Sequence, residues 1–95
     1  MMTELLEQAK DYLGITWQDE ATDRRISGFL ERGKARLNRI AGTALNFESE
    51  DLPKALLLDY CRYANAQALE VFEINFTGEL LDLHEQYYNM EEETK

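Results

Sequence analysis

Most of the positive charge of this sequence lies in one short segment. Residues 23–40, DRRISGFLERGKARLNRI, contain six of the ten Lys and Arg residues, although the whole chain has a formal net charge of −9. The segment has a net charge of +4, which leaves −13 for the other residues. Guanidinium groups bind carboxylates and phosphates through paired hydrogen bonds. Four arginines recur at intervals of seven, four and three residues, which places them on one side of a helix. This arginine stripe comprises Arg25, Arg32, Arg36 and Arg39.

Three kinds of partner could serve the arginine stripe. Within the chain it could pair with acidic positions such as Asp59, Glu70 and Glu73, or be solvated, and such surface pairs contribute only ~0–1 kcal/mol. In a homo-oligomer it could meet the acidic surface of a neighbouring copy, where charge complementarity selects partner and register. It could also bind phosphate, but the acidity of the rest of the chain repels a polyanion. We therefore expect an intramolecular pairing or a subunit contact rather than nucleic-acid binding.

The other reactive residue types lack the partners that catalysis or metal binding needs. His84 is the only histidine, and the neighbouring Asp82 and Glu85 do not have the spacing of metal ligands. The single cysteine, Cys61, lies in an apolar stretch, where thiols are usually inert core residues. The sequence has no glycine-rich phosphate loop and no Gly-x-Ser-x-Gly turn. We predict a structural histidine, no enzymatic activity, no metal and no cofactor.

The elements that must position these residues are predicted to be helices. Hydrophobic residues make up 44% of the chain and charged residues 31%, which is typical of a globular fold, and five Gly with one Pro favour a few helices over many short strands. The length of 95 residues suits a single domain over 1–95, with its core at about 4–76 and a C-terminal helix or tail at 77–95. No apolar run is long enough for a membrane span, so no membrane partner is expected.

Two helices are expected in the N-terminal half. Apolar residues at helical spacing predict the first over about 3–13, with Gly14 in a position to end it. The second carries the arginine stripe and is predicted to begin near Asp19 or Thr22 and to end at Gly42. Two glycines inside it lack side chains and are expected to let another helix approach closely: Gly28 and Gly33.

The next predicted helix is the most apolar segment of the chain. Proline is favoured in the first helical turn, so this helix is expected to start at Leu52-Pro53 and to run to Phe76, with a break at Thr77-Gly78 before a last helix. A helix that is apolar around most of its circumference must be covered on several sides. We therefore predict an all-α fold, a small bundle of about four helices around this central apolar helix. The predicted core includes Ile26, Leu30, Leu37, Leu57, Cys61, Ala64 and Phe72.

The order of these segments is similar to that of a known family. A helix ending in YLGI (12–15) is followed by a turn with DEATDRRI (19–26), a helix FLERGKARLNRIAG (29–42) and the segment LPKALLLDYCRYANA (52–66). This order resembles the small head-tail connector proteins of tailed bacteriophages, also called head-completion or adaptor proteins. The resemblance covers roughly residues 4–76, and the later segment FEINFTGELLDLHEQYYNM departs from it.

The resemblance implies a structural virion protein of a tailed phage or prophage. Such a subunit assembles with copies of itself into a ring below the portal protein and offers a surface to the downstream head-tail joining protein. DNA passes through the ring only as cargo. The protein would be found at the head-tail junction of the virion, and in the host cytoplasm during assembly.

The alternative is a small helical DNA-binding or regulatory protein that uses the arginine-bearing helix as its recognition helix. Gly, Leu and Phe positions interrupt the basic segment, and no turn of suitable helix-turn-helix length clearly precedes it. The composition therefore favours the connector interpretation.

Overall fold

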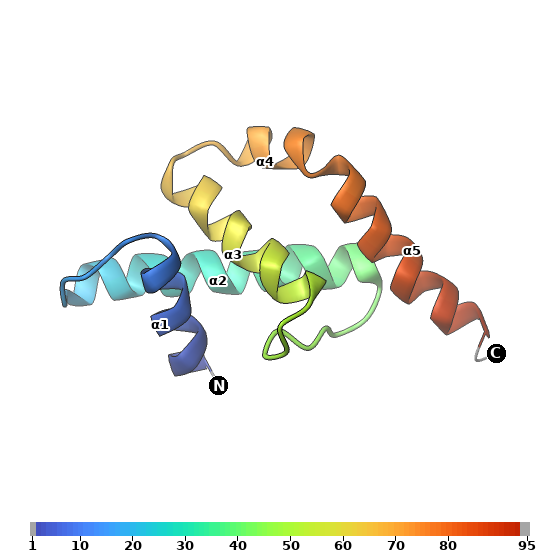
Figure 1. The fold of residues 1–95 in the computed structure, drawn as a ribbon, viewed down its shortest axis with the longest axis horizontal. Coiled ribbons are helices and arrows are strands. Elements are labelled where there is room, and N and C mark those ends of the chain that lie inside the picture. The colour runs from blue at the N-terminus through green and yellow to red at the C-terminus, as the bar shows by residue number, and fades with distance from the viewer. Residues whose placement is uncertain (1, 94–95) are drawn as a thin grey trace.

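The computed structural model describes the backbone of residues 2–93 and the side chains of residues 4–87, and all regular secondary structure in this part of the chain is helical (Figure 1). The all-α prediction is therefore confirmed. Instead of four helices, the described chain forms five: α1 (Met2–Tyr12), α2 (Glu20–Ala41), α3 (Leu52–Asn65), α4 (Leu69–Asn75) and α5 (Thr77–Glu93).

The ends of α1 and α2 are set by local signals. The chain leaves α1 through Gly14, whose φ of +76° is a left-handed conformation that suits glycine. Asp19 caps the start of α2, because its carboxylate accepts a hydrogen bond from the backbone N–H of Thr22 at 3.0 Å. Gly42 ends α2 in the left-handed region, with its N–H donating to the carbonyl of Asn38 at 2.8 Å. These boundaries agree with those predicted from the sequence.

The prediction of one uninterrupted helix from Pro53 to Phe76 is wrong. The chain turns between α3 and α4 because Gln67 adopts a left-handed φ of +58°. The N–H of Ala68 then donates to the carbonyl of Tyr63 at 2.8 Å, which satisfies a carbonyl at the end of α3. A left-handed residue at this position is usually glycine, so a glutamine gave no signal in the sequence.

The predicted break at Thr77-Gly78 is misplaced, because both residues are helical and the chain is interrupted one residue earlier. Phe76 alone separates α4 from α5, and Thr77 is already the first residue of α5. The hydroxyl of Thr77 lies 2.9 Å from the carbonyl oxygens of both Glu73 and Ile74, so it donates to the last turn of α4. The two helices therefore form a tight corner.

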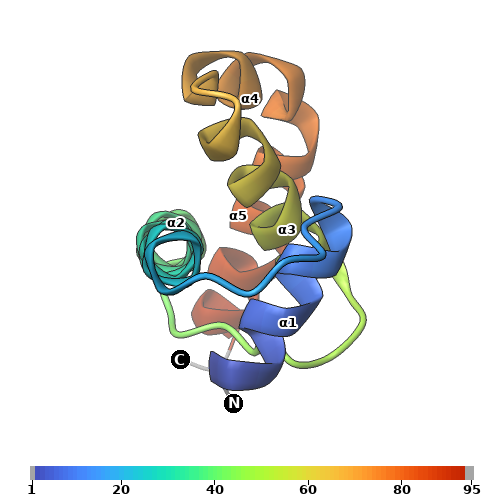
Figure 2. The same ribbon diagram turned by 90° about the vertical axis from the view of Figure 1, so that its left-hand side faces the viewer.

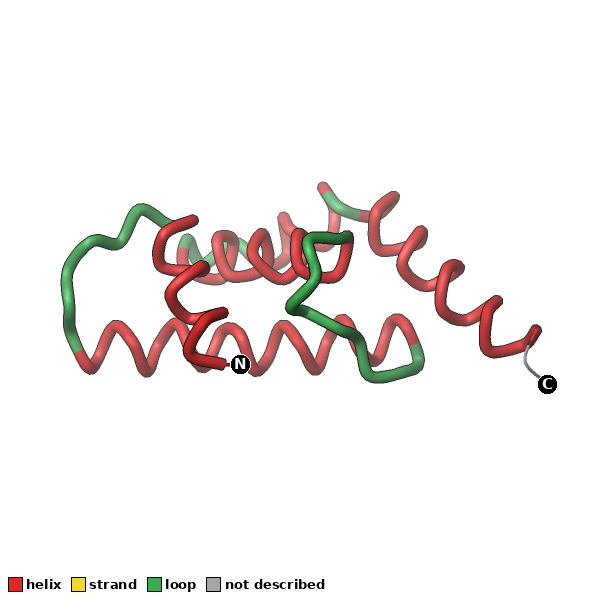
Figure 3. The backbone as a smooth tube through the Cα atoms, turned by 60° about the horizontal axis from the view of Figure 1, so that its bottom comes forward, coloured by secondary structure: helices red, strands yellow, loops and turns green. Residues whose placement is uncertain are grey.

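The long helix α2 forms the base of the molecule. It packs against α1, α3 and α5, whereas α3 packs against each of the other four helices. Figure 2 shows α2 on one side, with α1 and α3 on the other side. The end of α5 extends beyond the last turn of α2 (Figure 3).

One cluster of buried side chains joins these elements. Phe72 is fully buried, and its ring centroid lies 5.6 Å from that of Tyr60, 5.8 Å from that of Tyr63 and 4.9 Å from that of Phe76. The turn at Gln67 makes this possible because it folds α4 back toward α3. All seven core residues expected from the sequence are buried: Ile26, Leu30, Leu37, Leu57, Cys61, Ala64 and Phe72.

The two interior glycines of α2 differ in what surrounds them. A Cβ added at Gly33 would lie 2.7 Å from Cδ1 of Leu57 and 2.9 Å from Cδ1 of Tyr60, so α2 and α3 approach closely here. A Cβ at Gly28 would meet no atom within 4 Å, so the expected close approach at Gly28 is not found.

Alanine substitutions should therefore change stability in opposite directions. Gly33→Ala is expected to lower the free energy of unfolding by about 1–2 kcal/mol, because crowding in a packed core exceeds the gain in helix propensity. Gly28→Ala is the matched control and should raise it by about 0.5–1 kcal/mol. Urea unfolding followed by circular dichroism measures both. Equal stabilisation by the two substitutions would contradict the close contact at Gly33.

Candidate functional site

The arginine stripe lies on the exposed side of α2, and two of its members have polar partners within the chain. Nη2 of Arg25 donates to Oδ1 of Asn65 at 3.3 Å. Arg36 forms two parallel hydrogen bonds with the carboxylate of Glu73, with Nε–Oε2 and Nη2–Oε1 distances of 3.1 and 2.9 Å. This hydrogen bonding raises the pKa of Arg36. Both groups are partly exposed, so the pair contributes at most about 1 kcal/mol.

The other two members of the stripe are not engaged by carboxylates of the described residues. The Cζ of Arg32 lies 5.3 Å from the centroid of the Phe29 ring, which is a cation–π contact. Arg39 is exposed in the last turn of α2, and no hydrogen bond, ion pair or ring contact joins it to the side chains of residues 4–87. The intramolecular interpretation therefore fits Arg36 best and does not account for Arg39.

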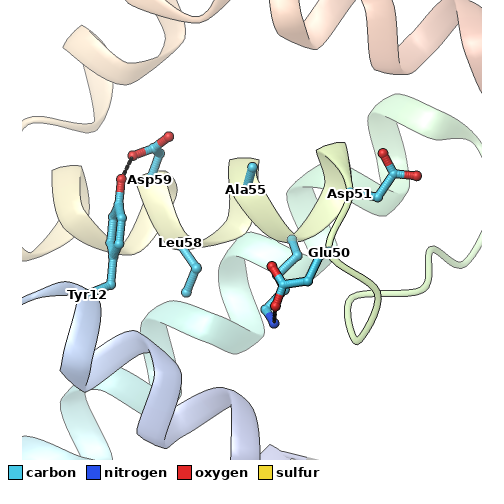
Figure 4. A pocket seen from close by; sticks show the side chains of 7 residues that line it. Tyr12, Glu50, Asp51, Ala55, Leu58 and Asp59 are labelled. Carbon is cyan, nitrogen blue, oxygen red and sulfur yellow. Dashed lines mark hydrogen bonds and ion pairs between the residues drawn. The ribbon is translucent and has the colours of Figure 1, made fainter.

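A pocket of about 370 Å³ lies at the junction of α1 and α3 (Figure 4). Its carboxylates come from the end of the loop before α3 and from the outer side of that helix, and its apolar surface comes from α3. In Figure 4 the α2 ribbon passes behind α3, so the pocket opens away from α2. The lining residues are Tyr12, Glu50, Asp51, Lys54, Ala55, Leu58 and Asp59.

Internal contacts fix the acidic groups of this pocket. Oδ1 of Asp51 accepts the N–H of Leu52 at 2.8 Å and so caps α3. The Lys54 ammonium is buried and bonds to Glu50 one helical turn away. These contacts restrain two of the carboxylates that line the pocket.

Asp59 lines the end of the pocket away from Glu50 and Asp51 (Figure 4). Its Oδ1 accepts hydrogen bonds from the Tyr12 hydroxyl and, at 3.3 Å, from the guanidinium of Arg62. The bond to Asp59 raises the pKa of Tyr12, because the ionised phenol could no longer donate. Tyr12 thereby ties α1 to α3. Asp59 was expected to be a possible partner of the arginine stripe, and it is instead bound to Tyr12 and Arg62.

His84 joins α5 to the C-terminal end of α2. Its Nδ1 lies 2.8 Å from the carbonyl oxygen of Ile40, so this nitrogen donates to one of the carbonyls left without a partner at a helix end. The contact gives His84 a structural role. A second, more open pocket of about 330 Å³ adjoins it, lined by Arg36, Ile40, Glu73, Thr77, Leu80, Leu81 and His84.

Cys61 is enclosed by the core. Its side chain is fully buried, and burial raises the pKa of the thiol to about 12. A thiol of this kind stays protonated at neutral pH and is a poor nucleophile. In the described residues, no group of three or more His, Cys, Asp or Glu side chains could hold a metal ion. None of the described helices is both long enough and apolar enough to span a bilayer.

Sequence reasoning identified the arginine stripe but missed the acidic pocket. Two of the pocket residues, Tyr12 and Asp59, are 47 positions apart in the sequence, so no local pattern indicates that they are in contact. One signal was present: the acidic run ESED immediately before Leu52-Pro53 places carboxylates at the start of α3. Comparison with protein-family models, with curated proteins and with solved structures found no match for this chain.

Proposed function

We propose that this protein is a head-tail connector subunit of a tailed phage or prophage, which assembles with copies of itself into a ring below the portal protein. The helices of each subunit pack as a small bundle around α3. The ring extends the channel through which DNA passes and presents a surface to the downstream head-tail joining protein. The protein is a structural component of the virion with no enzymatic activity.

The observation that carries this proposal is the presence of two unlike charged surfaces on one small subunit. The arginine stripe on α2 leaves Arg39 exposed, while an acidic pocket opens at the α1–α3 junction. A ring requires heterologous contacts, in which one surface of a subunit meets a different surface of the next. Opposite charges on these two surfaces favour head-to-tail association and oppose association of like surfaces.

The acidity of the chain also suits a channel for DNA. A net charge of −9 limits the binding of phosphates, so DNA would move past the ring without being retained. The family resemblance in the order of the helices supports the same function.

Reversing one exposed charge of the stripe should impair assembly. Arg39→Glu is expected to reduce the fraction of protein in rings, because it places a carboxylate against an acidic neighbour. The matched control is Arg24→Glu on the same helix, since Arg24 is also exposed, lies outside the arginine stripe and has its guanidinium 3.7 Å from Glu20. Sedimentation velocity and electron microscopy of the purified proteins measure assembly, alone and with a portal protein.

A DNA-binding measurement separates the connector from the regulatory alternative. A connector should bind duplex DNA weakly at physiological salt, whereas a specific regulator should bind its site with a Kd of about 10⁻⁸ M or lower. Unchanged assembly of Arg39→Glu, together with loss of tight DNA binding, would favour the regulator.

A further inference from the structure

We propose that the acidic pocket at the α1–α3 junction receives the Arg39 side chain of a second copy of this chain. This inference rests on the proposed self-assembly and identifies the two surfaces that meet. The pocket is defined by Tyr12, Glu50, Asp51, Lys54, Ala55, Leu58 and Asp59.

The chemistry of the pocket matches an arginine side chain. Each carboxylate uses one oxygen for an internal contact: Oδ1 of Asp51, Oδ1 of Asp59 and Oε2 of Glu50. Their second oxygens accept no hydrogen bond from the described residues. A guanidinium presents five N–H donors in a planar fork and can donate to the open oxygen of a carboxylate at one end of the pocket, either Asp59 or the pair Glu50 and Asp51.

The apolar part of the pocket suits the rest of the side chain. Ala55 and Leu58 lie four and one residues before Asp59 on α3, and all three line the pocket. The methylene stem of an arginine buries apolar surface while its charged head stays near polar groups. A small ammonium or metal ion would use the carboxylates but leave this apolar surface uncovered. The volume of about 370 Å³ also gives room for a complete side chain.

Among the four arginines of the stripe, Arg39 is the one left available. Asn65 accepts a bond from Arg25, Glu73 holds Arg36, and the guanidinium of Arg32 lies over Phe29. Arg39 has no such contact with the described side chains. It can therefore enter a neighbour without giving up an internal bond.

The positions of Arg39 and of the acidic pocket favour a contact between two copies over a contact within one chain. The pocket is lined by residues of α1, α3 and the loop before α3, and it opens on the side of α3 away from α2 (Figure 4). Arg39 lies in the last turn of α2. An Arg39-to-pocket contact would use different surfaces of two subunits, which is the heterologous arrangement that a ring requires.

A charge exchange tests the contact. Ala55 is exposed at the pocket, so Ala55→Arg should place a guanidinium there and weaken association on the order of tenfold. Arg39→Glu alone should weaken it similarly. The double variant Ala55→Arg/Arg39→Glu should recover most of the wild-type association, because the introduced carboxylate meets the introduced guanidinium. Sedimentation at several protein concentrations measures the association constant of each variant. The control is Ala44→Arg in the exposed loop after α2, which should leave the association constant unchanged.

Cross-linking gives a second readout that does not depend on the new charges. Protein with Ala55→Cys is mixed with protein carrying Ala35→Cys, an exposed position on α2 one turn before Arg39. A short bis-maleimide should join the two, since the buried Cys61 thiol is unreactive. A mixture of Ala55→Cys and Ala44→Cys should give little product.

The outcomes separate this inference from the proposed function. If the wild-type protein forms rings but the double variant is no better than either single variant, and Ala55→Cys does not cross-link to Ala35→Cys, the pocket contact is wrong while the connector function stands. If the wild-type protein forms no ring, alone or with a portal protein, both proposals fail.

Discussion

Replacement of Phe72 by alanine is expected to lower the free energy of unfolding by about 3–5 kcal/mol. Phe72 is the single buried residue of α4, and its ring contacts those of Tyr60, Tyr63 and Phe76. Removing it deletes a large apolar surface and leaves a cavity that the surrounding aromatic rings cannot fill completely. Because α4 has only seven residues, it has little stability of its own.

A neighbouring residue on the same helix provides the control for this prediction. Ile74 is 72% exposed, so Ile74→Ala should change the free energy of unfolding by no more than about 0.5 kcal/mol. Chemical denaturation of both variants makes the comparison. A loss below about 1 kcal/mol for Phe72→Ala would show that α4 is not anchored by this ring.

The Phe72→Ala variant should also affect the arginine stripe. Glu73 is adjacent to Phe72 and holds Arg36 through two hydrogen bonds. If α4 loosens, that pair loses its geometry, because both bonds need the carboxylate and guanidinium to stay coplanar. Loosening of α4 is therefore expected to lower the stability of the fold and to release Arg36 from Glu73 at the same time.

The second large effect is a loss of stability at alkaline pH that depends on Cys61. The thiol has a pKa near 9.0 when exposed and about 12 in the folded protein. Below pH 9 it is protonated in both states, so its contribution to stability is fully present. Above pH 9 the unfolded chain releases the proton while the folded chain keeps it, and stability falls as pH rises toward 12. At 1.36 kcal/mol per pKa unit, the loss between pH 8 and pH 10.5 is about 2 kcal/mol.

Cys61→Ala isolates this contribution from those of other groups. Tyr12 and Tyr60 also have raised pKa values, so they lower stability at alkaline pH in the wild-type and the variant alike. Between pH 8 and pH 10.5 the free energy of unfolding of Cys61→Ala should fall by about 2 kcal/mol less than that of the wild-type protein. Urea unfolding at each pH gives the free energy of unfolding of both proteins. If this free energy falls equally with pH in the two proteins, the thiol pKa is not strongly raised.

The proposed assembly connects these structural features to function. A connector subunit needs a stable core and two exposed surfaces that do not recognise themselves. The core is supplied by one cluster of buried side chains, and the surfaces by the arginine stripe and the acidic pocket. The fit of Arg39 into that pocket remains the central prediction for how copies meet.

The amino-acid sequence by itself determined the local features of this protein. The all-helical fold, the cap at Asp19, the ends at Gly14 and Gly42 and the shared side of the arginine stripe all follow from interactions within a few residues. Helical hydrogen bonds and caps join groups up to about four positions apart, so a short window of sequence contains the whole interaction.

Only the tertiary structure decided which distant segments contact one another and which side chains of the arginine stripe find partners within the chain. It turned the chain at Gln67, placed Gly33 but not Gly28 against α3, and paired Arg36 with Glu73, which is 37 positions away. It also formed the acidic pocket by bringing the end of α1 to α3. Such contacts depend on how whole helices pack, because packing requires side chains from distant segments to fill a common space. No periodicity within one segment specifies that arrangement.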